Sequence, residues 1–174
     1  MDDYRLEPLT EAHAGVVTEI FNRFVGSSFA AYPSAPVDES FFHRLAGLAQ
    51  GYPSVAVIAP DGSVAGFGML RRWHPADSFA RTAEVTYFIR PEHTGRGLGR
   101  MMLERFETEA RRLGVDTILA SISSLNEGSI RFHRQNGFAE CGRFRAVGRK
   151  FDRDFDVVWM QKRLEPTSQV PPPE

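Results

Sequence analysis

The sequence predicts a mixed α/β fold in which one central sheet of about seven strands is flanked by four helices. Runs of alternating or β-branched residues indicate the strands, and apolar residues at helical spacing indicate the helices. These runs follow one another in the order β, α, α, three β, α, β, α, β, β, with no internal repeat. A length of 174 residues suits one domain with a substantial core. We expect this domain at 1–165 and a proline-rich, disordered tail at 166–174.

Local signals define the elements of the N-terminal half. Thr10 and Asp38 are typical helix N-caps, and Pro60-Asp61-Gly62 is a hairpin turn signal. Val16, Ile20 and Phe24 recur every four residues and predict the apolar stripe of the first helix. The expected elements are a strand at 4–8, a helix from 11 to about 25, a helix after Asp38 ending near Gly51, and strands at 54–59 and 64–71.

The C-terminal half contains two further helices. The first begins at Gly97 and is stopped by Gly114, and the second is opened by a capping box at Ser124-Leu125-Asn126-Glu127. The apolar face of the first of these helices is expected to consist of Leu98, Met102, Phe106, Ala110 and Leu113. The expected elements are a strand at 82–90, a helix at 97–113, a strand at 116–122, a short helix ending at 136–137, and strands at 138–148 and 155–164.

A glycine-rich loop, Thr94-Gly95-Arg96-Gly97-Leu98-Gly99, lies between an expected strand and an expected helix. Glycines there let the backbone approach a ligand, and the helix N-terminus behind them favours a phosphate or pyrophosphate. Arg100-Met101 follows the loop, which excludes a P-loop, and the G-x-G-x-G spacing does not match a dinucleotide fingerprint. A plain glycine-rich turn remains the alternative.

Composition excludes several classes of protein. A net charge of −1, from 21 basic and 22 acidic residues, gives no reason to expect a nucleic-acid partner. No apolar run reaches membrane-spanning length, and no His/Cys/Asp cluster has metal-ligand spacing. Cys141 is the only cysteine, which rules out an internal disulfide and suits a reducing compartment. The N-terminus lacks the regions of a signal peptide, so we expect a cytoplasmic protein without a membrane partner.

The element order and the glycine loop together resemble the GCN5-related N-acetyltransferase (GNAT) family. Its loop pattern, Gln/Arg-x-x-Gly-x-Gly/Ala, is matched by 94–99, although Thr94 replaces the usual Gln or Arg. The family's short helix begins with Asn and leads to Gly-Phe, as Asn126 and Gly137-Phe138 do here. Segments 84–89, 126–133 and 148–158 resemble the phosphinothricin/methionine sulfoximine acetyltransferase branch.

One segment departs from that branch. Related sequences often carry an acidic Phe-Asp-x-x-Pro segment after the first helix, where this chain has Ser28-Phe29-Ala30-Ala31-Tyr32-Pro33. Because this segment would line the acceptor site, the identity of the acceptor is not carried over from the branch.

The resemblance implies acetyl-CoA as co-substrate, no metal, and a homodimer. The glycine loop would bind the pyrophosphate, the strand before it would offer main-chain groups to the pantetheine arm and to the oxyanion, and an asparagine would hold the reactive end. The residues assigned to coenzyme A are Tyr87, Phe88, Ile89, Gly95, Arg96, Gly97, Leu98, Gly99, Arg100 and Asn126.

Two side chains are candidates for catalysis. Glu84 is the expected general base, acting through a water on the acceptor ammonium; an exposed strand glutamate is the alternative. At the position of His133 many family members have a tyrosine that acts as the general acid, whereas the branch has a histidine. The resemblance therefore implies that His133 can protonate the departing thiolate. The alternative, a histidine packed between Phe132 and Phe138, is nearly as well supported.

The expected function is transfer of an acetyl group to the primary amine of a small polar acceptor, such as an amino acid or a phosphinothricin or methionine sulfoximine analogue. Arg72, His74 and Arg81 flank the Glu84 strand and are expected to hold a substrate carboxylate, with plain surface positions as the alternative. The competing functions are acetylation of a protein or peptide, and a non-catalytic acyl-CoA-binding module.

Overall fold

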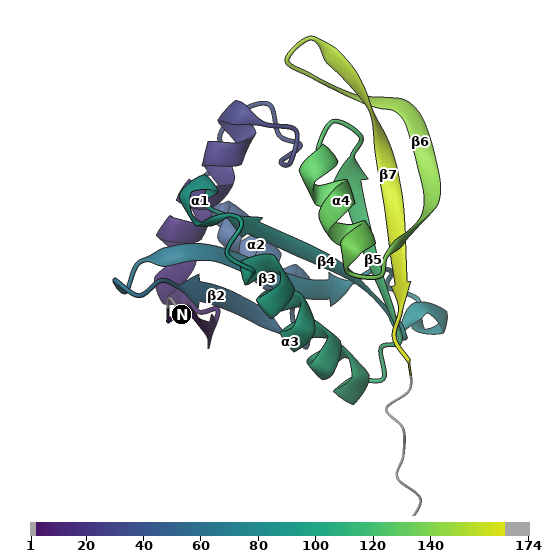
Figure 1. The fold of residues 1–174 in the computed structure, drawn as a ribbon, viewed down its shortest axis with the longest axis horizontal. Helices are drawn as coiled ribbons and strands as arrows, with labels where there is room; N and C mark the ends of the chain where they lie inside the picture. Colours follow the sequence, from purple (N-terminus) through teal and green to yellow (C-terminus); the bar gives the residue numbers. More distant parts are fainter. Residues whose placement is uncertain (1–2, 166–174) are drawn as a thin grey trace, which may run out of the picture.

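Seven strands form one mixed sheet in the computed structural model, which describes residues 3–165 (Figure 1). The strand order is β1-β2-β3-β4-β5-β7-β6, and the pairing is antiparallel throughout except between β4 and β5. The predicted fold class is confirmed, while the expected tail at 166–174 lies outside the described residues. The strands are β1 Arg5–Pro8, β2 Ser54–Ile58, β3 Val64–Arg72, β4 Thr82–Ile89, β5 Thr117–Ser123, β6 Ala139–Lys150 and β7 Arg153–Arg163.

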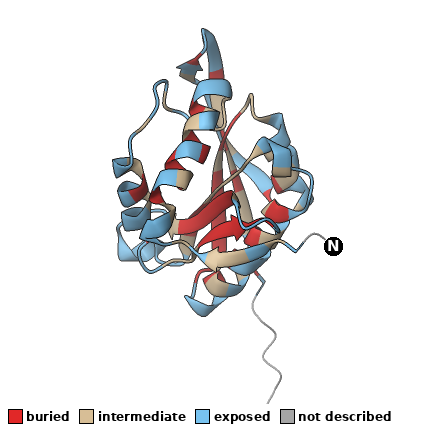
Figure 2. Ribbon diagram, turned by 90° about the vertical axis from the view of Figure 1, so that its left-hand side faces the viewer, coloured by how far each residue is buried: buried red, intermediate tan, exposed pale blue. Residues whose placement is uncertain are grey.

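The main helices cover both faces of the sheet. Helices α1 and α2 share an apolar cluster with Phe67 and Met69 of β3, whereas α3 packs in a second cluster with Leu70. Figure 2 shows the buried residues gathered on the central strands. The helices are α1 Ala14–Ser27, α2 Ser40–Leu48, α3 Leu98–Arg112 and α4 Glu127–Gln135, with 3₁₀ turns at η1 Glu11–His13, η2 Asp77–Phe79 and η3 Pro91–His93. No described helix is long and apolar enough to cross a bilayer.

Strand alternation decides which side chains of β4 meet which helices. Phe88 contacts the Phe21 and Phe24 rings of α1, so Glu84 and Thr86, at even spacing from it, belong to the same face. Tyr87 instead contacts His133 of α4. The α1–α2 face and the α3–α4 face of β4 therefore carry different chemistry.

The sheet opens between β4 and β5. In these strands only Thr82–Glu84 of β4 pair with Thr117–Leu119 of β5. Strand β5 itself continues to pair with β7 as far as Ser123. Beyond Glu84, the edge of β4 that faces β5 therefore has no strand partner among the described residues. This opening positions the candidate site.

The structure corrects three details of the helices. The N-cap of α4 is Asn126, whose Oδ1 accepts from Ser129 N at 3.3 Å, rather than Ser124, which exchanges two hydrogen bonds with Asp156 of β7. In α1 the buried stripe is Val17, Ile20, Phe21 and Val25, so the predicted Val16 and Phe24 are only half-buried. Leu113 is exposed, because α3 ends one residue before it.

The last two strands are longer than predicted and form a hairpin. Lys150 pairs with Arg153, and the two residues between them, Phe151 and Asp152, have φ values of 49° and 55°. Two consecutive residues with positive φ match the twist of a tight hairpin. The usual Asn-Gly signal is absent from this turn, which explains why the sequence predicts a gap there.

Candidate functional site

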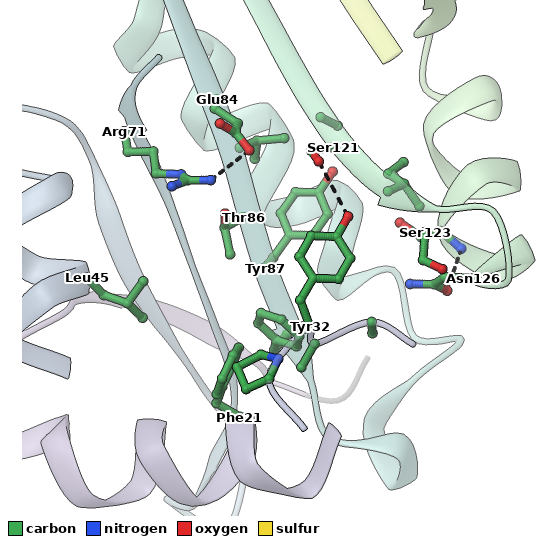
Figure 3. Close-up of a pocket in the computed structure, with 18 of the residues that line it drawn as sticks. Phe21, Tyr32, Leu45, Arg71, Glu84, Thr86, Tyr87, Ser121, Ser123 and Asn126 are labelled. Atoms are coloured by element: carbon green, nitrogen blue, oxygen red, sulfur yellow. Dashed lines mark hydrogen bonds and ion pairs between the residues drawn. The ribbon is translucent and has the colours of Figure 1, made fainter. Parts of the chain in front are cut away.

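The opening between β4 and β5 leads into a cavity of about 360 Å³ (Figure 3). Phe21 and Leu45 line it from the α1–α2 side, and Ser129 and His133 line it from the α4 side. The cavity thus passes through the sheet, where the two strands no longer pair. Its middle section is lined by Glu84, Val85, Thr86, Tyr87 and Phe88 of β4 and by Ala120, Ser121, Ile122 and Ser123 of β5.

Glu84 stands at the point where the two strands separate. It is 9% exposed, and its Oε1 accepts a hydrogen bond from Arg71 Nη2 at 2.7 Å. Burial raises the pKa of the Glu84 carboxyl, and the neighbouring guanidinium partly opposes this rise. The alternative of an exposed strand glutamate is therefore wrong, and the cavity contains a buried carboxyl group whose pKa is raised.

The arginine that lines the cavity is Arg71, one position before the expected Arg72. In the β3–β4 register, Arg71 lies opposite Glu84 and Arg72 opposite Ala83, so their side chains leave the sheet on opposite faces. Neither Arg72, His74 nor Arg81 lines the cavity. Sequence reasoning missed Arg71 because adjacent strand residues can be assigned to faces only when the register is known.

Those three residues make contacts elsewhere. Arg72 donates to the His74 carbonyl at 2.9 Å and lies 3.2 Å from Asp77 Oδ1. His74 Nδ1 accepts from Ala76 N, and Arg81 forms an ion pair with Asp116. The structure thus places them as surface residues, in agreement with the alternative stated above.

His133 lines the cavity and has hydrogen-bond partners at both of its ring nitrogens. Its Nδ1 donates to the Ser129 carbonyl oxygen at 2.7 Å, since a carbonyl can only accept, and its Nε2 lies 2.7 Å from Tyr87 Oη. The residue is 2% exposed, and burial lowers its pKa to about 4. At neutral pH the imidazole is therefore uncharged, and its Nε2 accepts a hydrogen bond from the Tyr87 hydroxyl.

This geometry does not favour His133 as the acid that protonates a thiolate. Its one N–H is bound to the backbone, and a cationic form would exist only in acidic solution. The ring contacts Phe138 and Phe132, with centroids 4.9 and 5.3 Å away, as expected for the packed alternative. The residue orients the Tyr87 hydroxyl, which sequence reasoning had assigned no role.

The glycine loop connects the end of β4 to the start of α3. Gly95 and Gly97 have φ values of 75° and 80°, the left-handed conformation that favours glycine. Helix α3 begins at Leu98, so its unpaired N-terminal N–H groups face this loop. Arg100 Nε binds Glu104 Oε1 at 2.8 Å, which directs that guanidinium along the helix. An anion can be bound here by backbone groups alone.

Asn126 and the segment after α1 complete the cavity wall. Asn126 lines the cavity while capping α4, and Ala30, Ala31, Tyr32 and Pro33 line it from the other side. The Tyr32 hydroxyl points toward Ser121, 3.4 Å away (Figure 3).

A buried lysine fixes this segment in place. Lys150 is 4% exposed, and its Nζ donates to the carbonyl oxygens of Ser28 and Ala31 at 2.8 and 2.7 Å. Its partners lie more than a hundred positions away in the sequence, so no local signal could have indicated this role.

Within residues 3–165, no group of three or more His, Cys, Asp or Glu side chains is placed to hold a metal ion. The cavity itself is lined by a buried carboxylate, a guanidinium, several hydroxyl groups and the open edge of β4.

Comparison with known proteins identifies similar chains. The profile of the Acetyltransferase (GNAT) family matches residues 17–138. An L-methionine sulfoximine/L-methionine sulfone acetyltransferase of Pseudomonas aeruginosa is 34% identical over 159 residues, 89% of this chain and 91% of the relative. An L-amino acid N-acyltransferase of Escherichia coli is 33% identical over 159 residues, which are again 89% of this chain and 91% of the relative. The crystal structure of a Sinorhizobium meliloti phosphinothricin acetyltransferase in complex with acetyl-CoA matches with a TM-score of 0.87 and 27% identity, covering 97% of this chain and 96% of that one.

Proposed function

The chain belongs to the acetyltransferase (GNAT) family and is an acetyl-CoA-dependent N-acetyltransferase, and we propose that Glu84 is its general base toward an amino-acid-like acceptor. The reaction transfers the acetyl group to the primary amine of a small polar molecule. The observation that carries the proposal is the buried Glu84 carboxylate, placed where β4 and β5 separate.

The open edge of β4 suits the pantetheine arm of acetyl-CoA. Main-chain groups of Tyr87, Phe88 and Ile89 lie beyond the last β4–β5 pair, where an extended ligand can bind as an added strand does. The 95–100 loop and the α3 N-terminus would receive the pyrophosphate, and Asn126 would lie near the thioester. A main-chain N–H of this β4 segment is the proposed oxyanion donor.

Glu84 prepares the amine for attack. The acceptor ammonium gives one proton to the carboxylate, through a water, and the free amine then attacks the thioester carbonyl carbon. The tetrahedral intermediate collapses with cleavage of the C–S bond; the amide nitrogen loses its second proton and the coenzyme A thiolate gains one. The raised pKa of Glu84 brings the base closer to neutral pH, where proton transfer is most efficient.

The cavity supports a small acceptor over a protein substrate. A volume of about 360 Å³ is that of a small-molecule site, and residues 30–33 form one wall of it. Relatives that share most of their length with this chain are named for L-amino acids, methionine sulfoximine and phosphinothricin. The same class of amine is therefore proposed here.

Replacing Glu84 tests the proposal. In Glu84→Gln, we expect kcat for L-methionine sulfone to fall about 10²- to 10⁴-fold, because the amide cannot take the ammonium proton. Thiol release from acetyl-CoA measures the rate, and acetyl-CoA binding should be retained. Glu92→Gln, which removes an exposed carboxylate that pairs with Arg23, is the matched control. Full activity of Glu84→Gln would contradict the assignment of the base.

We also propose that the protein is a cytoplasmic homodimer. The resemblance to its branch supports two copies, and an exposed apolar group on the β6–β7 hairpin, Phe144, Val147 and Phe151, supplies a surface for them. A single cysteine, which cannot form an internal disulfide, suits the reducing cytoplasm.

A further inference from the structure

Arg71 is the only cationic side chain among the described residues that line the cavity, if the neutral His133 is set aside. It gives one N–H to Glu84, and its Nε is buried without a hydrogen-bond partner. A guanidinium offers five N–H donors, and a buried donor without a partner is costly. The Arg71 side chain as a whole is 29% exposed and lines the cavity, so its guanidinium can contact a ligand there beside the proposed base.

The paired charges of Glu84 and Arg71 are complementary to a zwitterion. In an α-amino acid, the ammonium and the carboxylate are bonded to the same carbon, so the two charges stay close together. Glu84 and Arg71 also stand side by side, 2.7 Å apart on neighbouring strands. A zwitterion can meet both groups while adding no net charge to a half-buried site.

We propose that Arg71 determines acceptor specificity by binding the acid group of the acceptor while Glu84 receives the neighbouring ammonium. Preferred acceptors are then α-amino acids and close analogues. An amine without an acid group would compete with Arg71 for Glu84 and leave the guanidinium without its partner, which is unfavourable where water is scarce. This inference rests on the proposed function and refines its substrate class.

A simpler role for Arg71 makes a different prediction. If Arg71 served only to hold Glu84 ionised and in place, its loss would slow every amine acceptor by the same factor. If it binds the acid group, its loss would slow only acceptors that carry one. The ratio of kcat/KM between two matched acceptors separates these roles, because any effect on Glu84 cancels in it.

The experiment compares L-methionine sulfone with its α-carboxamide at one pH, using thiol release from acetyl-CoA. We expect the wild-type enzyme to favour the acid, and the ratio of kcat/KM values to fall about 10- to 100-fold in Arg71→Met. Arg71→Lys should lower the ratio less, since it keeps the charge but loses the planar fork. Arg23→Met, which removes an exposed guanidinium on α1, should leave the ratio unchanged.

Circular dichroism and acetyl-CoA binding establish that each variant is folded, and Arg71→Lys carries the test if Arg71→Met does not fold. An unchanged ratio in the folded variants, or equal use of both acceptors by the wild type, would overturn the inference and leave the proposed function intact. Thiol release with neither acceptor would instead contradict the proposed function, and this inference with it.

Discussion

At the scale of single residues, burial acts on Glu84 and His133 in opposite directions. Removal from water disfavours the charged form of each, which raises the pKa of the carboxyl and lowers that of the imidazole. Only Glu84 has a charged partner, Arg71, that restores its ionised form. This contrast supports the proposal that Glu84, rather than His133, exchanges a proton with the substrate, whereas the His133 ring contacts the Tyr87 hydroxyl.

The lowered pKa of His133 predicts how stability depends on pH. Between its unfolded pKa of about 6.5 and its folded value of about 4, the unfolded chain binds the proton and the folded chain does not. Stability is therefore fully present above that range and is lost as pH falls through it. The full effect for this group is about 3 kcal/mol.

Urea unfolding of wild type and His133→Asn between pH 7.5 and 4 measures this contribution. We expect the stability advantage of the wild type over the variant to shrink by up to about 3 kcal/mol as the pH falls. Carboxylates that titrate in the same range affect both proteins equally and cancel in the difference. A difference that does not change with pH would show that His133 is not a buried neutral imidazole.

At the scale of elements, the cavity wall is built by segments far apart in the sequence. The 28–33 segment has no regular secondary structure, and Lys150 of β6 supplies donors for two of its carbonyl groups. The Phe29 and Tyr32 rings also contact Phe155 of β7. The hairpin therefore positions one side of the cavity, where the acceptor is proposed to bind.

Loss of the Lys150 ammonium should weaken that wall. In Lys150→Met, two carbonyl oxygens lose a charged donor, and we expect the free energy of unfolding to fall by about 1–3 kcal/mol. The KM for the acceptor should rise. The KM for acetyl-CoA should change little, because Lys150 binds the 28–33 segment and not the 95–100 loop that is proposed to bind coenzyme A. Lys150→Arg keeps a cationic donor and should restore part of both properties. Unchanged stability and acceptor KM in Lys150→Met would show that the contact does not support the wall.

At the scale of the whole molecule, sequence reasoning recovered what local patterns determine. Strand and helix runs and the glycine-rich loop with Gly95 and Gly97 follow from short segments, whereas Glu84 as the base follows from the family resemblance and stays a proposal. The choice between Arg71 and Arg72 depends on the β3–β4 register, and the role of Lys150 on a contact across 119 positions. The opening beyond Glu84 arises from strands that diverge in space. None of these three leaves a periodic signal in the chain.

The proposed homodimer also belongs to this scale, because its surface lies on the β6–β7 hairpin, whose Phe151 contacts Phe29 of the 28–33 segment. The β6–β7 hairpin projects from the sheet (Figure 1) and exposes Phe144, Val147 and Phe151 by 58%, 60% and 51%. Large exposed apolar side chains on one hairpin are a candidate contact surface. We expect light scattering at micromolar concentration to give twice the chain mass for the wild type, and Val147→Glu to weaken association at least about 10-fold, since it buries a charge at the interface.

Leu48→Glu is the matched control for that experiment, because Leu48 is an apolar residue of similar exposure, 49%, on α2. It should leave the dimer intact, which separates an effect of the hairpin from a general effect of added charge. A wild-type mass of one chain would contradict the homodimer itself. If the Val147→Glu protein remained dimeric, the homodimer would stand, but its two copies would contact each other through a face other than the hairpin. Since the same hairpin carries Lys150, the monomeric variant should also show a raised acceptor KM if association helps to fix the 28–33 wall.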